Sequence, residues 1–241
     1  MSRYRNDFGM DEVRTFWDSI AEHEYEHANE QLDRVHTQRF REALKRLELR
    51  PGMRVLNVWS RIGDGVPWLR EECPGIELVN AELSMEMLRC SRRLNPGEAH
   101  VQTSLHELPF ADDSFDTVMS LETLEHVPDP LLFLEELRRV LVGGGRLVMS
   151  LPPSFAEWTS VLNSLLRFHH EEGPHRFLSP REVRSMLSDA GFRLDDYRGT
   201  LFVPLEGQWA EKLDSTVARL IGRSFLGQLG MRCFYVCTAA V

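Results

Sequence analysis

The stretch from Leu108 to Pro130, LPFADDSFDTVMSLETLEHVPDP, decides the fold of this chain. Its segment Phe115–Leu121 is apolar at the centre, which is typical of a buried strand. The residues from Pro130 to Val142 follow as a predicted helix, which three glycines, Gly143 to Gly145, would close. A strand that leads into a helix in this way is the repeating unit of a parallel sheet covered by helices.

The same alternation extends to both sides of this stretch. Further strands are predicted over residues 54–59, 76–83, 100–105, 146–151, 192–203 and 231–241, the last two antiparallel to each other. Helices are predicted between them, one of them with Ser84 as its N-cap and another beginning at Ser179. The sequence therefore predicts a doubly wound α/β fold with a mostly parallel seven-stranded sheet, an N-terminal helical segment over 1–50, and helical insertions near 153–175 and 205–228.

Bulk composition narrows the classes of function. The 241 residues carry a net charge of -9 and 42% hydrophobic residues, which suits a folded domain and disfavours binding to a nucleic-acid backbone. The polar start and the lack of a long apolar run predict a cytoplasmic protein without a signal peptide or a membrane span. The four cysteines are spread over the chain, so we expect reduced structural thiols and no metal site.

A ligand site is predicted where the parallel strands end. In open α/β sheets, ligands bind beyond the carboxyl ends of the strands, near the switch in strand order. Glu82 closes the strand that reads LVNAE, and a carboxylate at that position can accept hydrogen bonds from both hydroxyls of a ribose. The alternative is that Glu82 is an ordinary solvated glutamate at a strand end, with no role in ligand binding. The other strand ends at this edge are Asn57–Gly63, Ser104-Leu105 and Ser120–Glu122.

Several ordered motifs resemble those of the class I S-adenosylmethionine-dependent methyltransferases, in the small-molecule branch similar to ubiquinone-biosynthesis enzymes. The resemblance runs from about Phe16 to the C-terminus, and it implies a Rossmann-like methyltransferase fold. Phe16-Trp17 and Tyr25 resemble the lid segment of that family, which implies a lid over 1–50 and a methyltransferase-like domain over 51–241. The motifs that carry the resemblance are Leu108-Pro109-Phe110, Asp113-Ser114-Phe115-Asp116, Leu124-Glu125-His126-Val127, Gly143-Gly144-Gly145-Arg146-Leu147 and Ala190-Gly191-Phe192.

By position, the resemblance implies S-adenosylmethionine as cofactor. Glu82 would bind the ribose, Leu121 would lie close to the sulfonium, and Tyr25 would close over the site. The first loop would surround the methionine end, and the remaining residues would line the adenine. The residues so implied are Tyr25, Asn57, Trp59, Arg61, Gly63, Glu82, Leu83, Ser104, Leu105 and Leu121.

The chain departs from the family in its first loop. Asn57 replaces the usual acid, Trp59 and Arg61 replace two glycines, and only Gly63 remains; Ser104 replaces a further acid. Glycine permits positive φ and a close approach of backbone to ligand, which bulky residues do not. Three alternatives follow: the loop takes another path and Arg61 pairs with the cofactor's carboxylate, Trp59 fills the pocket, or the site holds another adenosine-like ligand.

Catalytic candidates come from the histidines. His175, His170 and His126 are candidates for a general base, since imidazole titrates near neutral pH. The structural alternative is that His126 packs in the core and that the other two lie on the surface. Apolar stripes over 155–166 and 209–220 are expected to pack mainly on the core; the alternatives are a wall for a hydrophobic acceptor and, for the second stripe, a dimer contact.

Two hypotheses of function remain in view. In the first, the chain is an enzyme that transfers a methyl group from S-adenosylmethionine to an O, N or C atom of a small-molecule acceptor, which can be hydrophobic. In the second, it is a non-catalytic methyltransferase-like binding or scaffold protein with a blocked cofactor pocket. A nicotinamide-dependent oxidoreductase is disfavoured because the G-x-G-x-x-G fingerprint is not intact.

Overall fold

The computed structural model describes residues 6–27, 34–153, 173–203, 205 and 207–240. Seven strands form one sheet in the order β3-β2-β1-β4-β5-β7-β6, with β7 antiparallel to both of its neighbours. The strands are β1 (Arg54–Val58), β2 (Glu77–Glu82), β3 (Ala99–Gln102), β4 (Phe115–Leu121), β5 (Leu141–Leu151), β6 (Phe192–Thr200) and β7 (Arg232–Ala239). The predicted doubly wound, mostly parallel seven-stranded sheet is confirmed.

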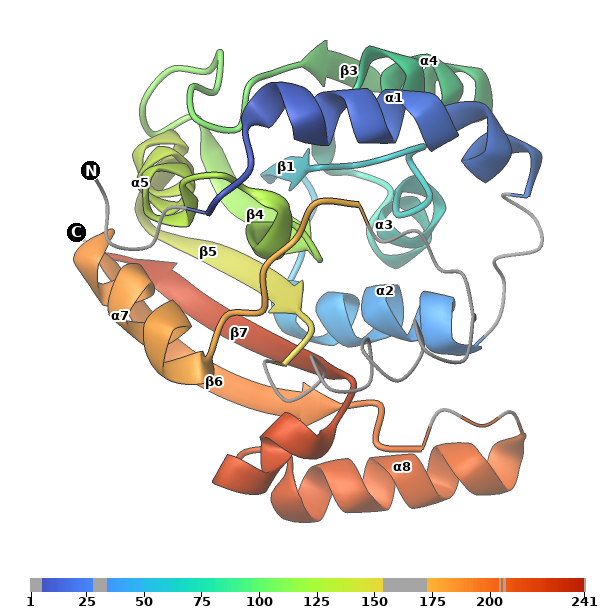
Figure 1. Ribbon diagram of the computed structural model, residues 1–241, viewed down its shortest axis with the longest axis vertical. Helices are drawn as coiled ribbons and strands as arrows, with labels where there is room; N and C mark the ends of the chain where they lie inside the picture. The colour runs from blue at the N-terminus through green and yellow to red at the C-terminus, as the bar shows by residue number, and fades with distance from the viewer. Residues whose placement is uncertain (1–5, 28–33, 154–172, 204, 206, 241) are drawn as a thin grey trace.

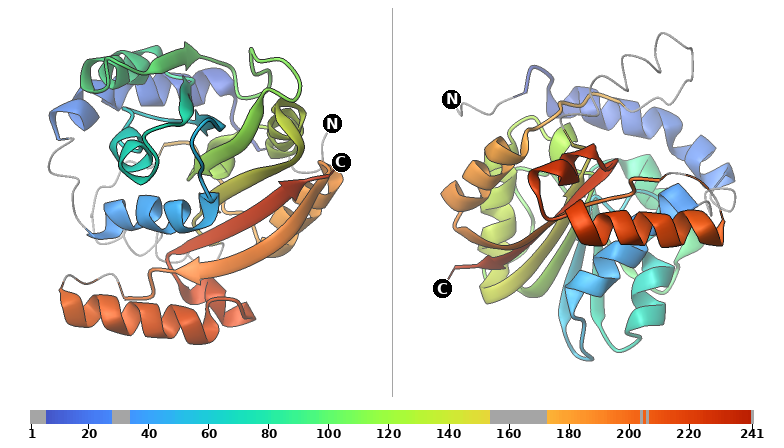
Figure 2. Two further views of the ribbon diagram at one scale, coloured as in Figure 1. Left: turned by 180° about the vertical axis from the view of Figure 1, so that it is seen from behind. Right: turned by 90° about the horizontal axis from the view of Figure 1, so that it is seen from below.

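Helices cover both faces of this sheet (Figures 1 and 2). They are α1 (Met10–Glu26), α2 (Arg34–Leu47), α3 (Val66–Glu72), α4 (Met85–Leu94), α5 (Pro130–Val140), α7 (Pro180–Asp189) and α8 (Gln208–Ile221), with short 3-10 turns η1 (Leu124–His126) and η3 (Phe225–Leu229). Side chains on the two faces of the central strands belong to two separate cores. Val55 packs with α2 and α3, whereas Leu56 and Val58 pack with α1, α4, α5 and α7.

Element boundaries follow the sequence signals closely, with one exception in β5. Ser84 caps α4 by accepting from the amide of Met87, and Ser179 begins α7 in a capping box, both as predicted. The glycines from Gly143 to Gly145, predicted to end the preceding helix in a turn, lie within β5, which begins at Leu141. An irregular register between β4 and β5 accommodates these extra residues in the ladder.

The predicted core packing of the helix at 209–220 is wrong. α8 forms as expected, but Trp209 is 60% exposed, Leu213 45% and Leu220 75%. Its buried residues are instead Ala210 and Asp214. The apolar stripe therefore faces outward, and the helix is held by its polar and small side chains. The other predicted stripe, at 155–166, lies outside the described residues.

The first helix, α1, lies along α4 and over the end of β1 (Figure 1). Asp18 accepts hydrogen bonds from the Ser84 hydroxyl at 2.5 Å and from the Glu86 amide at 3.2 Å, so α1 contributes to the cap of α4. The segment before α1 is held by Asn6, whose side chain donates to the Val127 carbonyl at 2.5 Å. These contacts fix α1 across the carboxyl edge of the sheet.

Two further expectations can be compared with the fold. Cys73, Cys90, Cys233 and Cys237 are buried free thiols, in keeping with a structural role. Among the helices in the described ranges, none combines the length and the apolar composition that a membrane crossing requires.

Candidate active site

The loop after β1 keeps the backbone conformation that glycine favours. Trp59 has φ 57°, Arg61 has φ 50° and Gly63 has φ 78°, so three alternate residues occupy the left-handed region. That region costs a non-glycine residue roughly 1–2 kcal/mol. A side chain at Gly63 would overlap the Ser91 hydroxyl. The loop therefore turns as a glycine loop would, with two large side chains added to it.

The indole of Trp59 fills the space above this loop. It is 4% exposed and stacks on the imidazole of His126, with ring centroids 5.7 Å apart and an interplanar angle of 15°. Trp17 from α1 meets it edge to face at 5.6 Å. The three rings form one aromatic cluster that joins α1, the β1 loop and η1, so the second alternative raised by the sequence, in which Trp59 fills the pocket, describes this conformation.

The side chain of Arg61 contacts two residues of α1. Its guanidinium pairs with the carboxylate of Glu24 at 2.6 Å and lies 4.9 Å above the ring of Trp17. Both groups of the ion pair are largely buried, with side chains 16% and 15% exposed. Arg61 thus fastens α1 onto the loop.

Glu82 ends β2 at the predicted edge, but its carboxylate is engaged by the backbone. It accepts hydrogen bonds from the amides of Arg61 at 2.7 Å, Leu83 at 2.8 Å and Ser84 at 2.9 Å. Burial raises the pKa of Glu82 to about 7, and the three amide donors oppose that shift. The acidic side chain is therefore in place beside the loop, with its oxygens directed at protein donors.

Four of the predicted cofactor residues line one small cavity: Asn57, Trp59, Arg61 and Leu121. Asn57 donates to the side chain of Asn80 at 2.9 Å across β1 and β2. The cavity among the described residues measures about 10 Å³, which is room for one water at most.

The other predicted cofactor residues lie around this centre. Leu83 and Leu105 are buried in the core, and the hydroxyl of Ser104 accepts from the amide of His106 at 3.2 Å. Tyr25 lies beneath Arg93 of α4, whose guanidinium is 3.7 Å from the ring centre. These residues are outside the lining of the small cavity.

Polar atoms without partners gather at the same place. The unpaired buried atoms include Nε1 of Trp17, Oγ of Ser60 and Nε of Arg61, and Nε of Arg39 is a fourth. Three of these side chains line the small cavity, and the fourth, Trp17, contacts Trp59. A buried polar group without a partner costs roughly 1–3 kcal/mol, so this arrangement is only weakly stabilised for its degree of burial.

Two of the three candidate bases are described. His126 is buried in the aromatic cluster, where burial lowers its pKa to about 4, and its Nδ1 donates to the Pro174 carbonyl at 2.8 Å. His175 meets the ring of His126 edge to face at 6.0 Å and donates from Nδ1 to the Gly173 carbonyl at 2.9 Å. His170 lies outside the described residues. The structure thus brings His175 and His126 together beside Trp59.

A partly buried charge network below the loop was missed by sequence reasoning. Glu122, directly after β4, accepts from Arg232 at 2.5 Å and from Arg39 at 3.0 Å, and Arg39 also pairs with Asp64. Burial alone would raise the pKa of Glu122, but the two guanidinium groups hold it well below its usual range. Arg39 and Glu122 are 83 positions apart, so no local pattern signals their contact.

The fold defines an α/β protein with a doubly wound, mostly parallel sheet, and comparison with known proteins identifies its family. A family model described as a methyltransferase domain matches residues 60–149. A demethylmenaquinone methyltransferase of Renibacterium salmoninarum is 32% identical over 169 residues, covering 69% of this chain and 70% of the relative. A ubiquinone biosynthesis O-methyltransferase of Xanthomonas euvesicatoria is 32% identical, covering 66% of this chain and 70% of the relative. With some other curated relatives, the match spans about half of their length, 54% in one from Paenarthrobacter aurescens.

Solved structures share the fold. A putative methyltransferase from Haloferax volcanii, solved in complex with the Trm112 methyltransferase activator, superposes with a TM-score of 0.70 at 20% identity, covering 93% of this chain and 98% of that one. A possible histamine N-methyltransferase from Thermotoga maritima superposes with a TM-score of 0.64 at 20% identity, covering 94% of this chain and 99% of that one.

The chain belongs to the class I S-adenosylmethionine-dependent methyltransferases, in the branch that contains the ubiquinone and menaquinone enzymes. Its enzyme class is accordingly that of a methyltransferase, and its cofactor is S-adenosylmethionine. A carboxylate such as that of Glu82 can accept hydrogen bonds from the ribose hydroxyls of S-adenosylmethionine. The small cavity beside it is too small for that molecule, because ligand pockets measure about 300 Å³ or more and this cavity measures about 10 Å³. In this conformation the described residues do not accommodate the cofactor.

Proposed function

We propose that this chain transfers a methyl group from S-adenosylmethionine to an O, N or C atom of a small-molecule acceptor. The observation that carries the proposal is the position of Glu82, whose carboxylate lies 2.7 Å from the amide of Arg61 in the β1 loop, at the carboxyl edge of the sheet. A carboxylate there is placed to exchange backbone donors for ribose hydroxyls once the loop is freed.

We further propose that the conformation described here is closed and that the donor enters when α1 leaves the strand ends. The unpaired polar atoms of Trp17, Ser60 and Arg61 support this, because opening would give each of them water or ligand as a partner. In the described part of the predicted N-terminal segment, α1 places Trp17 against Trp59 of the β1 loop, whereas Phe40 and Leu47 of α2 are part of the sheet's core. The proposed lid is therefore α1.

For the acceptor, the names of the relatives suggest a quinone precursor. The match with this chain covers 70% of the length of a demethylmenaquinone methyltransferase and 70% of the length of a ubiquinone biosynthesis O-methyltransferase. We propose demethylmenaquinone as the first acceptor to examine.

The test is the transfer of labelled methyl from S-adenosylmethionine to demethylmenaquinone by the wild type, Glu82→Ala and Glu77→Ala. Glu77 is an exposed glutamate at the start of the same strand and serves as the matched control. We expect wild type and Glu77→Ala to transfer label at the same rate and Glu82→Ala to lose most of it. A folded Glu82→Ala protein that transfers label as fast as wild type would contradict the role of Glu82.

A further inference from the structure

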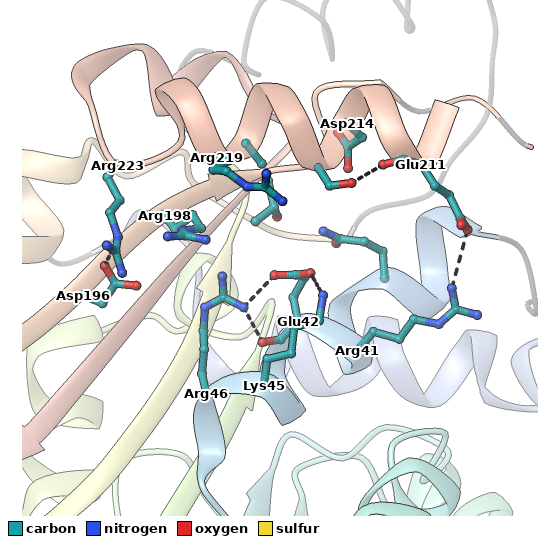
Figure 3. A pocket seen from close by; sticks show the side chains of 14 residues that line it. Arg41, Glu42, Lys45, Arg46, Asp196, Arg198, Glu211, Asp214, Arg219 and Arg223 are labelled. Atoms are coloured by element: carbon teal, nitrogen blue, oxygen red, sulfur yellow. Dashed lines mark hydrogen bonds and ion pairs between the residues drawn. The ribbon is translucent and has the colours of Figure 1, made fainter. Parts of the chain in front are cut away.

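A second and much larger cavity lies away from the β1 loop, between α2, β6 and α8 (Figure 3). It measures about 510 Å³, which is the size of a small-molecule site. Because β6 runs parallel to β5, Thr200 at its end places this cavity at the same edge of the sheet as the β1 loop, toward the far flank. Gln38 of α2 faces this cavity, and the next residue, Arg39, lines the small one.

The lining of this cavity is rich in positive charge. Among the described residues it contains six basic and four acidic side chains, an excess of two positive charges in a chain whose net charge is -9. The basic residues are Arg41, Lys45, Arg46, Arg198, Arg219 and Arg223. The acidic residues are Glu42, Asp196, Glu211 and Asp214.

The acidic side chains are already committed. Glu42 pairs with Lys45 at 2.5 Å and with Arg46 at 2.7 Å. Asp214, on α8, is buried and accepts from the backbone amides of Phe202 and Val203. Its carboxylate is thus engaged by the chain that follows β6.

The other two acids hold arginines at the rim. Asp196 pairs with Arg223 at 2.9 Å, and Glu211 lies 3.8 Å from Arg41 across the mouth of the cavity. Every lining carboxylate therefore has a partner before Arg198 and Arg219 are considered.

Arg198 and Arg219 are left without a carboxylate partner within the described part of the chain. Arg198 is half-buried on β6, and its Nε is buried with no hydrogen-bond acceptor. Arg219 projects from α8, and Figure 3 shows both side chains at the same part of the cavity, beside the guanidinium of Arg46. Arg46 itself is only 9% exposed and is held by Glu42, so it is fixed in direction.

We propose that this cavity binds a phosphate-bearing small molecule through Arg198 and Arg219, with Arg46 adding a third positive charge. A guanidinium presents paired N–H donors that match the oxygens of a phosphate, and two unpaired guanidinium groups at one place recognise a dianion better than either alone. The buried Nε of Arg198 gains its missing acceptor in the same step. The site stands apart from the proposed donor site and does not depend on methyl transfer.

The experiment is a calorimetric titration of the full chain with inorganic pyrophosphate and, separately, with ADP, at constant ionic strength. The proteins are wild type, Arg198→Gln, Arg219→Gln and the control Arg89→Gln, an arginine 61% exposed on α4. We expect saturable binding by wild type and by the control, and about tenfold or greater weakening in each of the other two variants. Arg219 is exposed on α8, so its variant keeps the test valid if Arg198→Gln unfolds.

The two ligands separate the sources of the phosphate. ADP binding more tightly than pyrophosphate, with the same dependence on both arginines, identifies a nucleotide-type ligand, and equal binding identifies a site for the phosphates alone. The proposal is overturned if neither ligand binds saturably to wild type, or if binding is the same in folded Arg219→Gln as in Arg89→Gln. Neither result bears on Glu82, so this proposal and the proposed methyl transfer fail independently.

Discussion

Trp59 and His126 stack face to face, with ring centroids 5.7 Å apart and their planes inclined by 15°. The stack joins the loop after β1 to the turn after β4, at the edge of the sheet where we propose that the donor binds. A position that favours glycine by its backbone thus carries the largest side chain available. The proposed closure of the site rests on this side chain together with the contacts that α1 makes with it.

Replacing Trp59 with glycine should destabilise the protein by about 1–4 kcal/mol. Loss of a buried large aromatic side chain costs roughly 3–5 kcal/mol, and relief of the left-handed backbone returns roughly 1–2 kcal/mol. Urea denaturation of Trp59→Gly measures the difference. Trp209→Ala, at a site 60% exposed, is the control and should change the free energy of unfolding by less than about 1 kcal/mol. A Trp59→Gly protein as stable as wild type would mean that the indole is not packed in solution.

Glu82 should make stability depend on pH in the direction opposite to most carboxylates. Its pKa rises from 4.5 to about 7 on folding, because burial disfavours the charged form. The folded state therefore holds a proton more tightly than the unfolded state, so its contribution is full below pH 4.5 and is lost as the pH rises to about 7.

Melting temperatures between pH 4.5 and 8 test this, with Glu82→Gln compared with wild type. The stability of wild type relative to Glu82→Gln should fall across this range, while its stability relative to Glu77→Gln, exposed on the same strand, should stay level. A constant difference between wild type and Glu82→Gln would refute the shift.

Glu122 should be among the costliest charges to remove. Its carboxylate lies between Arg232 and Arg39, and its loss leaves both guanidinium groups short of a partner. Breaking a fully buried ion pair from one side costs roughly 3 kcal/mol, and because the Glu122 side chain is 27% exposed we expect Glu122→Gln to lose about 2 kcal/mol in chemical denaturation. Asp11→Asn removes an exposed pair with Arg14 and should cost less than about 1 kcal/mol. Equal effects of the two variants would argue against the network.

Most of the fold was predictable because its signals are local. The apolar segment Phe115–Leu121 became β4 with the same limits, and the capping residues Ser84 and Ser179 began the helices they were assigned to. The strand ends also placed Glu82 and the β1 loop side by side correctly. Periodicity and capping are properties of neighbouring residues, so one sequence suffices to find them.

The features that sequence analysis failed to predict depend on contacts between residues that are distant in the sequence. Nothing near Arg61 indicates that it pairs with Glu24, 37 positions away, and nothing near Arg39 indicates Glu122. The outward face of α8 was mispredicted for the same reason, since an apolar stripe shows that a helix has two faces but not which partner lies beside it. The proposed closure likewise depends on contacts between α1 and the loop, which are distant in the sequence.

The most direct test of the closed site is a calorimetric titration with S-adenosylhomocysteine of wild type, Glu24→Ala and Glu12→Ala. Glu24 holds α1 to Arg61, whereas Glu12 is exposed on the same helix. If binding requires α1 to leave, the apparent affinity scales with the open fraction, and loss of a contact worth about 1.4 kcal/mol raises that fraction about tenfold. We predict that Glu24→Ala binds S-adenosylhomocysteine about tenfold more tightly than wild type does. The control Glu12→Ala should bind it with the affinity of wild type. Binding by Glu24→Ala no tighter than by wild type would contradict the account, and no binding by any of the three would favour a blocked, non-catalytic site.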